Sequence, residues 1–250
     1  MSKFAVSASS LRTWNGVIGA VHLTSFTALS ILSGIFFDQT LQVRIWTDFG
    51  GTEIQSLGAY RLFWTLLPFP LITGLIHVWI AVADADNYSR SVLQNGVNRL
   101  RWIEYAITNG LISWSVTLLA GAGSLLFPIT AVLSNFVMQY FGYLHEVYNH
   151  RRTSGRSLWL IFVGFIPWAI NWFIVLVYFL ERVAREGASV SDWLAVIGSL
   201  VWSLAFVAPL LWRYYKPNTV ENNYTMELIY ILLSLSAKLW LDWVVTIGSL

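Results

Sequence analysis

The sequence predicts an all-α membrane protein, a bundle of seven transmembrane helices. Of its 250 residues, 56% are hydrophobic and only 11% are charged, whereas charged residues make up about a quarter of a soluble domain. The hydrophobic residues are gathered in seven runs of about 20 residues, the length that crosses a bilayer. We therefore expect residues 1–250 to form a single seven-helix domain, with the lipid bilayer as its main partner.

The seven segments are separated by connections that, with one exception, are short. Their approximate bounds are Leu11–Phe37, Gly58–Ala83, Gly96–Ala120, Ser124–Val147, Leu158–Arg182, Ser191–Tyr214 and Asn222–Ser249. A turn around Gly121 and Gly123 joins the third segment to the fourth. Pro167 predicts a kink in the fifth segment, since proline removes a helical hydrogen bond.

The long connection between the first two segments, Asp38–Leu57, predicts a β-hairpin. Residues Leu41–Trp46 alternate apolar and polar side chains, Asp48–Gly51 supply turn residues, and Thr52–Ser56 follow as the second strand. An irregular loop is the alternative.

The distribution of basic residues predicts the orientation in the membrane. Ten lie in or beside the N-terminal tail and the second–third, fourth–fifth and sixth–seventh connections, and four lie on the opposite side, with Lys238 left out because it is inside a segment. Cytoplasmic loops carry the excess of Lys and Arg. We therefore expect a cytoplasmic N-terminus, an extracellular C-terminus and an extracellular hairpin. The ten are Lys3, Arg12, Arg90, Arg99, Arg101, Arg151, Arg152, Arg156, Arg213 and Lys216, and the four are Arg44, Arg61, Arg182 and Arg185.

Lys238 lies near the middle of the seventh segment, where a charged side chain costs roughly 2.5–3.5 kcal/mol. It follows Glu227 by 11 residues and precedes the end of the sequence by 12, so it is roughly 16–18 Å from either end of a helix. A lysine side chain cannot reach water over that distance. A buried ion pair or a covalent imine remains, since a desolvated amine condenses with aldehydes. Lysine at this place in a seventh helix points to a retinal Schiff base.

Glu104, in the third segment, is the predicted counter-ion of Lys238. It lies about two turns from the cytoplasmic end, and Thr108 follows one turn later on the same face. Side chains lean toward the N-terminus of their helix, so Lys238 should lean toward the cytoplasmic half, where Ser234 is one turn away. The alternative is that Glu104 pairs only with Arg101 near the interface.

His22 and His77 are predicted to lie at a similar depth to Glu104, where a carboxylate with two imidazoles would accept protons. A single histidine inside the membrane is more often a hydrogen-bonded packing residue, and the shared depth of the two gives the proton-accepting interpretation equal weight. A His/His/Glu metal site lacks ligand spacing, and we expect none. Asp242, one turn beyond Lys238, is a structural residue or a second counter-ion. His145, Glu146 and His150 are expected to form an ion network at the membrane interface with the neighbouring arginines.

Aromatic side chains in the fifth and sixth segments, and a similar face on the fourth, are candidates for a slot that holds a polyene. They recur at i,i+4 spacing, which places each pair on one helix face. Helix packing alone would explain the same pattern. The candidates are Met138 and Gly142, Trp168 and Trp172, and Trp202 and Phe206.

These features together resemble the heliorhodopsin family, over the whole chain. The resemblance depends on Arg101-Trp-Ile-Glu104-Tyr105 in the third segment and Ser234-Leu-Ser-Ala-Lys238 in the seventh, with the inverted orientation, the long first extracellular loop and the paired histidines. It implies all-trans retinal on Lys238, Glu104 as counter-ion, and Ser234 and Thr108 near the imine. Family members commonly have serine at the position of Thr108, which keeps the hydroxyl.

The resemblance also implies a homodimer and a slow photocycle that serves light sensing, with an unidentified cytoplasmic signalling partner. An enzyme function has little support, and no nucleic-acid-binding motif is present. A light-gated proton channel is the first alternative, because some viral members conduct protons; Asp242 and Asn171 offer only a thin polar path beyond Lys238. A retinal-free transporter with a Lys238–Glu104 ion pair is the second.

Overall fold

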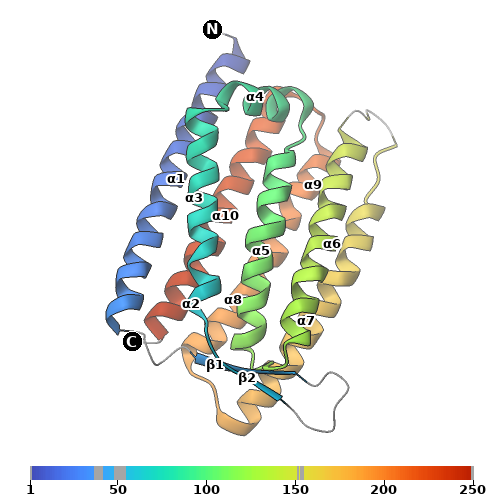
Figure 1. Cartoon of the computed structure of the whole chain (residues 1–250). Coiled ribbons are helices and arrows are strands. Elements are labelled where there is room, and N and C mark those ends of the chain that lie inside the picture. Colours follow the sequence, from blue (N-terminus) through green and yellow to red (C-terminus); the bar gives the residue numbers. More distant parts are fainter. Residues whose placement is uncertain (1, 37–41, 48–54, 151, 153–154, 249–250) are drawn as a thin grey trace.

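A computed structural model shows an elongated bundle of long helices (Figure 1). It describes residues 2–36, 42–47, 55–150, 152 and 155–248. The helices are α1 (Lys3–Phe36), α2 (Phe63–Leu66), α3 (Pro68–Val82), α4 (Ala85–Ser89), a π-helical turn η1 (Arg90–Asn95), α5 (Arg99–Leu119), α6 (Leu126–Asn149), α7 (Trp159–Glu186), α8 (Val190–Ala205), α9 (Val207–Tyr215) and α10 (Val220–Gly248). Two strands, β1 (Gln42–Thr47) and β2 (Gln55–Arg61), complete the described elements.

The predicted seven-helix fold is confirmed. The seven crossings are α1, α2 with α3, α5, α6, α7, α8 with α9, and α10. Among the described residues, five of these are long and apolar enough to cross a bilayer by composition alone. The other two, α5 and α6, have the length but carry buried polar side chains, among them Glu104 and Glu146. Hydropathy therefore understates the crossings that hold the polar interior.

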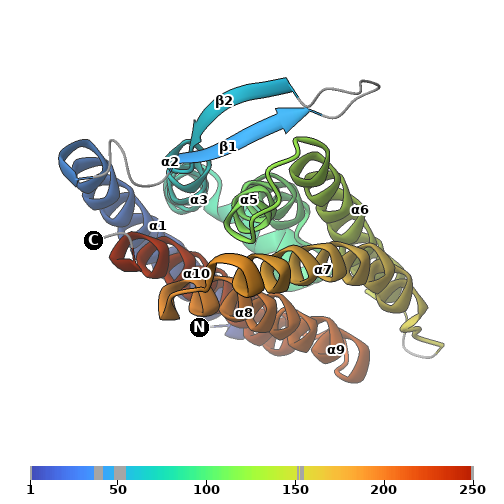
Figure 2. The ribbon, with the colours of Figure 1, turned by 90° about the horizontal axis from the view of Figure 1, so that it is seen from below.

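The helices close into a ring around the candidate residues. In sequence order α1 packs on α3, α3 on α5, α5 on α6 and α6 on α7, while α10 packs on both α8 and α1. Side chains join α7 to α8: Arg182 pairs with Asp192, and the rings of Phe179 and Trp193 meet edge to face at 4.8 Å. Seen along the bundle, this ring places α5 and α10 across its interior from one another (Figure 2).

Several helix boundaries differ from the expectations. The second segment is expected to begin at Gly58, but its helix begins at Phe63, because residues 58–61 belong to strand β2. The first helix begins at Lys3, eight residues before the expected Leu11, because a helix can continue into water beyond its apolar stretch. Pro167 lies inside α7, which is one continuous helix from Trp159 to Glu186, and the kink expected there stays a prediction. The sixth crossing is divided: α8 ends at Ala205 and α9 begins at Val207, just before Pro209, whose missing N–H cannot bond to the preceding turn.

The predicted hairpin is present in its paired part. Strands β1 and β2 are antiparallel, with Gln42 opposite Arg61 and an irregularity after Ile45, where Gly58 has a φ of +101°. A bulge often uses a glycine in this way. The second strand is described from Gln55 to Arg61, and the predicted turn Asp48–Gly51 and the start of the predicted second strand, residues 52–54, lie outside the described residues. The strands lie across the end of the bundle away from the N-terminus (Figure 1).

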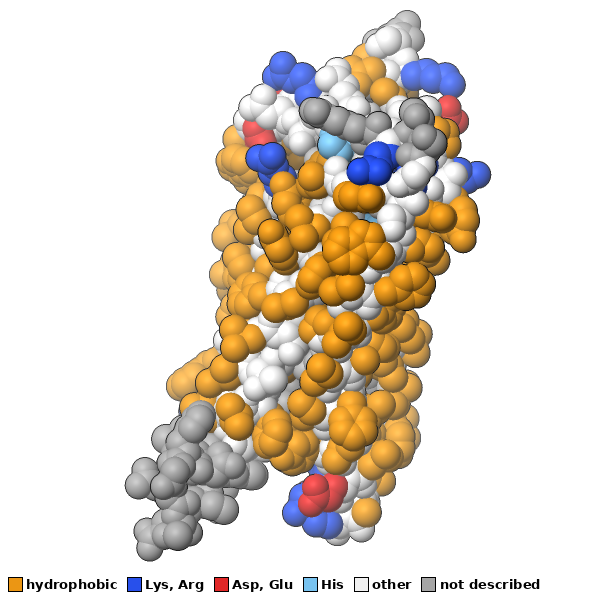
Figure 3. All heavy atoms as spheres, turned by 90° about the vertical axis from the view of Figure 1, so that its right-hand side faces the viewer, with side chains coloured by type: hydrophobic (Ala, Val, Ile, Leu, Met, Phe, Trp, Pro, Cys, Tyr) orange, Lys and Arg blue, Asp and Glu red, His pale blue; other side chains and the backbone are white. Residues whose placement is uncertain are grey.

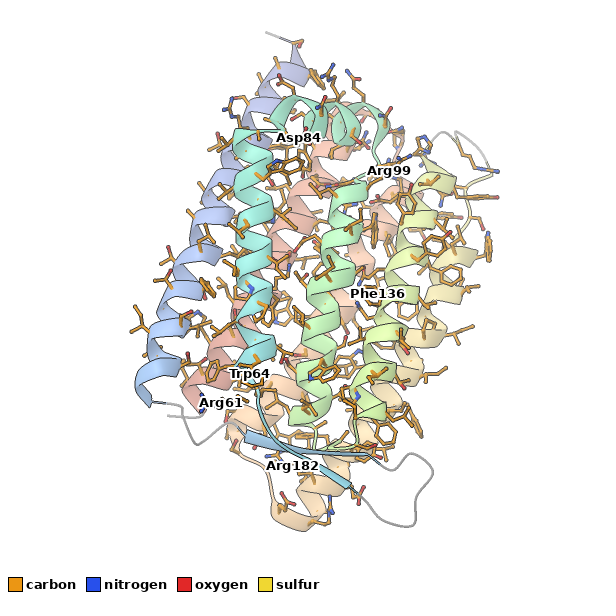
Figure 4. The ribbon with its side chains drawn as sticks, in the orientation of Figure 1. Arg61, Trp64, Asp84, Arg99, Phe136 and Arg182 are labelled. Carbon is orange, nitrogen blue, oxygen red and sulfur yellow. The ribbon has the colours of Figure 1, made fainter. Side chains whose placement is uncertain are left out.

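The sides of the bundle are apolar, and its charged side chains gather at the two ends (Figure 3). Phe162 and Phe173 are 68% and 70% exposed on α7, and Leu133 is 58% exposed on α6. Asp84 and Arg99 mark one end, and Arg61 and Arg182 mark the other (Figure 4). Side chains of this kind are stable on the outside only in contact with lipid, so the chain is an integral membrane protein.

Candidate functional site

The centre of the bundle holds a buried ion pair between Lys238 of α10 and Glu104 of α5. Lys238 is 1% exposed and Glu104 is 3% exposed. The Lys238 Nζ donates a hydrogen bond to Glu104 Oε1. Both helices begin at the same end of the bundle, and the lysine leans toward that end, so a residue five positions into α5 meets a residue deep in α10. The structure thus brings together the two residues that the sequence predicted to pair.

Two threonines complete the surroundings of this pair. Thr73 of α3 accepts a hydrogen bond from Lys238 Nζ at 2.6 Å and donates one to Glu104 Oε1 at 2.7 Å. Thr108 donates to the Glu104 backbone oxygen at 2.9 Å and lies 3.4 Å from Glu104 Oε1. Such bonds offset part of the desolvation cost of a buried carboxylate. Ser234 is buried on the expected face of α10, but it is not a hydrogen-bond partner of Lys238.

Arg101 does not pair with Glu104, which excludes the interfacial alternative. Its guanidinium contacts two other carboxylates, Glu146 of α6 and Glu227 of α10, and stacks on the ring of Tyr230 with 3.7 Å between Cζ and the ring centroid. The expected ion network at the membrane interface is therefore wrong for Glu146, which is fully buried. The inner faces of α5, α6 and α10 converge here, so the carboxylates turn inward.

Neutral donors satisfy the remaining oxygens of these two glutamates. Tyr88 donates to Glu227 at 2.6 Å and Asn98 does so at 2.8 Å. The indole Nε1 of Trp102 donates to Glu146 at 2.8 Å. A buried charge is tolerated when it is paired and fully hydrogen-bonded in this way. The result is a second buried polar cluster, about one helical turn beyond Glu104 toward the N-terminal end of α5.

The two histidines lie together, as their depth predicted. The rings of His22 and His77 are stacked with centroids 6.4 Å apart and an interplanar angle of 10°. His77 Nδ1 is 2.7 Å from the side-chain oxygen of Asn15, whereas neither nitrogen of His22 has a hydrogen-bond partner in the described part of the chain. Within the same residues, no three His, Asp or Glu side chains are arranged to hold a metal ion.

A small cavity lies between His77, the carboxylate of Glu104 and the Arg101 cluster. Its volume is about 20 Å³, and its walls include His77, Glu104, Arg101, Tyr88 and Glu227. A cavity above roughly 10–15 Å³ has room for one water molecule when polar groups surround it. Proton transfer among these groups would therefore need only short steps, directly or through one water.

A larger apolar cavity of about 150 Å³ lies on the other side of Tyr105. The Lys238 Nζ is 5.4 Å from the centroid of the Tyr105 ring, and Ala237 and Leu241 of the same helix line the cavity. All six residues that the sequence proposed for a polyene slot line its walls. They are Met138, Gly142, Trp168, Trp172, Trp202 and Phe206.

The shape of this cavity depends on close packing at Gly142. A Cβ added there would overlap the ring of Trp102, so the absence of a side chain lets the indole lie flat against α6. On the opposite wall Trp168 donates from its indole nitrogen to Ser203 at 3.1 Å, which ties α7 to α8. An apolar, ring-lined cavity with a buried lysine beside it has the form and the chemistry that a conjugated aldehyde requires.

Sequence reasoning missed Thr73, Asn15 and the Arg101 cluster. Thr73 precedes His77 by four residues, so the helical period placed it on the same face, and this spacing was the available signal. Asn15 is seven residues before His22, again on one face. The partners of Arg101 are 45 and 126 residues away in the chain, and no local pattern indicates them.

Comparison with known proteins agrees with this architecture. A sequence model of the heliorhodopsin family matches residues 11–250. No curated protein sequence matches the chain. The family match covers all seven crossings and both partners of the central ion pair. The chain therefore belongs to the heliorhodopsin family, whose members are seven-helix rhodopsins that bind retinal through a lysine Schiff base.

Proposed function

We propose that this chain is a light sensor that carries all-trans retinal on Lys238 as a Schiff base and signals through a slow photocycle without pumping ions. The carrying observation is the buried Lys238–Glu104 pair beside a ring-lined apolar cavity. A lysine in such surroundings is available as a nucleophile whenever it loses its proton. Trp168, Trp172, Trp202, Phe206, Met138 and Gly142 would then enclose the polyene.

When bound, retinal supplies the absorption of visible light and a change of shape at the Lys238 nitrogen. The protein contributes the charge that keeps this nitrogen protonated in the dark, which is the role of Glu104. Thr73 and Thr108 hold the carboxylate in place. Ser234 lies on the same face of α10. Its hydroxyl group would be near the Lys238 nitrogen once the hydrogen bond between that nitrogen and Thr73 is broken.

The released proton would move toward His22 and His77 and not to water. The small cavity of about 20 Å³ touches both His77 and Glu104, and Asn15 orients the His77 ring. Because the groups around this cavity are buried, the proton would remain inside the protein and return slowly. A long-lived rearrangement at this end of the bundle would then change the connections that a partner protein contacts.

The direction of the chain in the membrane supports a cytoplasmic output. Arg101 and Arg213 are buried and paired or hydrogen-bonded, so they do not count as loop charges. Removing these two from the ten leaves eight basic residues against four, which still favours a cytoplasmic N-terminal end. We expect a homodimer in the membrane and a cytoplasmic signalling partner.

Visible spectra of the purified protein with added all-trans retinal test the central proposal. Wild type should gain a visible band, Lys238→Ala should not, and Lys216→Ala should keep it because that lysine is exposed at the end of α9. Unchanged elution in size-exclusion chromatography would show that the variants fold. A wild type without any band would overturn the proposal and favour the retinal-free transporter.

Substitution of both histidines tests the route of the proton. In the double variant His22→Ala, His77→Ala, the light-induced loss of the proton from Lys238 should slow by about tenfold or more. This is less than the rate increase that a positioned general base usually contributes. Flash photolysis measures this step, with His150→Ala as the control because His150 is at the end of α6, away from the ion pair. An unchanged rate in the double variant would remove the histidines from the route.

One observation favours a second candidate, a light-gated proton channel. Asp242 is 1% exposed and lies beyond Lys238 on α10, so the polar path does not stop at the lysine. Photocurrents in voltage-clamped cells that express the protein would support conduction. A pH electrode that records no light-driven change in a cell suspension would support the sensor.

A further inference from the structure

Asp242 is a buried carboxyl group for which the proposed light sensor has no use. It is 1% exposed, and neither of its side-chain oxygens has a hydrogen-bond partner within the described part of the chain. Its neighbours on α10, Leu241 and Val245, belong to the large apolar cluster that also contains Trp172 and Phe179. A carboxylate anion in such surroundings is strongly unfavourable, whereas a neutral carboxylic acid is tolerated.

Asp242 and Glu104 lie on opposite sides of the Lys238 nitrogen along the bundle. Asp242 follows Lys238 by four residues, which is about 6 Å along the helix and on the same face. The Lys238 side chain leaves the helix toward its N-terminal end, where it meets Glu104 and Thr73. The Asp242 side chain leans the same way, so it extends from the far side back toward Lys238.

The two carboxyl groups have opposite environments. Glu104 has a cation and two hydroxyl groups as neighbours and is suited to be an anion. The side-chain oxygens of Asp242 have no hydrogen-bond partner within the described part of the chain, so this group is suited to hold a proton. Two carboxyl groups that differ in this way, on either side of one titrating nitrogen, commonly divide the roles of proton acceptor and proton donor.

We propose that Asp242 is the internal proton donor that restores the proton of the Lys238 nitrogen after light has moved it toward Glu104 and the histidines. The O–H bond of Asp242 breaks and an N–H bond forms on Lys238, with no change in oxidation state. The Asp242 carboxylate then recovers its proton from the one held near Glu104 and the histidines, so the cycle closes with no net movement of protons across the membrane. This inference rests on the proposed function and gives its slow photocycle a return step.

The protonated state of Asp242 can be tested without retinal. Infrared spectra of wild type grown with carbon-13 carboxyl-labelled aspartate should show the C=O band of a protonated acid that shifts with the label, in the apoprotein at neutral pH. Asp242→Asn should remove this band, and Asp86→Asn should keep it because Asp86 is exposed. A wild type without the band would overturn the inference and leave the light sensor intact.

The donor role is tested by flash photolysis of the retinal-loaded protein. In Asp242→Asn the light-induced loss of the Lys238 proton should keep its rate, and the return should slow at least about tenfold. Asp242→Glu, which keeps the acid, should recover most of the return rate, and Asp86→Asn should match wild type. A return of unchanged rate in Asp242→Asn would overturn the donor role. Absence of a visible band in every form would instead overturn the proposed function itself.

Discussion

At the scale of single residues, the function depends on how one buried cation is neutralised. Lys238 has one carboxylate partner, Glu104, and one hydroxyl partner, Thr73, on its hydrogen-bonding side. Removing one member of a buried pair leaves the other uncompensated, at a cost of about 3–5 kcal/mol. The protonation of the lysine nitrogen should therefore respond to Glu104 more than to any other single side chain.

Glu104→Gln should move the absorption of the retinal-loaded protein from the visible to the near ultraviolet at neutral pH. Glutamine keeps the shape and can still bond to Thr73, but it removes the negative charge. A loss of about 3 kcal/mol shifts the protonation equilibrium on the order of 100-fold. Glu146→Gln is the matched control, because Glu146 is equally buried but contacts Arg101. Equal spectra for the two variants would contradict the assignment of Glu104.

The sequence was sufficient to predict the pairing of Lys238 with Glu104, because the depth of each residue in the membrane can be counted from the end of its segment. It was also sufficient for the six cavity side chains, since helical spacing decides which of them share a face. It was not sufficient for Thr73, whose role depends on how α3 is rotated against α5 and α10. The depth of a residue is a local property, whereas its partner is set by tertiary packing.

At the scale of elements, Arg101 ties three helices together. It lies on α5 and contacts Glu146 of α6 and Glu227 of α10. The hydropathy of α5 and α6 is low because of such inward residues, and both helices fail a composition test that the other five crossings pass. In α5, the residues that lower the hydropathy include Arg101 and Glu104, which belong to the site.

Arg101→Gln should lower the free energy of unfolding by about 3–5 kcal/mol, because it leaves two buried carboxylates without their cation. Arg99→Gln, two residues earlier and exposed, should change it by less than about 0.5 kcal/mol. Both effects are measurable by unfolding in detergent with increasing sodium dodecyl sulfate. Equal stabilities of the two variants would mean that the cluster does not hold α5, α6 and α10 together.

At the scale of the whole molecule, the count of seven crossings was predictable, but the closure of the ring was not. Apolar length sets the number of segments, and short connections make sequential neighbours pack side by side. The ring is closed by the contact of α10 with α1 and by side-chain bridges from α7 to α8. No local sequence pattern in these segments indicates which helix each one contacts. The paired strands at the far end followed from alternation and turn residues, both local patterns.

The direction of the molecule in the membrane decides which end can signal, and it can be measured directly because the chain contains no cysteine. A single cysteine then reports its own location. Gln94→Cys lies at the end of the bundle near the N-terminus, and Glu186→Cys lies at the opposite end, where α7 finishes; both positions are exposed. The excess of basic residues near Gln94 predicts that this end is cytoplasmic.

In intact cells, a membrane-impermeant maleimide should label Glu186→Cys at once and Gln94→Cys only after the membrane is permeabilised. The cysteine-free parent should remain unlabelled in both conditions. The reverse pattern would place the Glu104, histidine and Arg101 groups in the extracellular half. A partner protein would then have to meet the light-driven rearrangement from outside the cell.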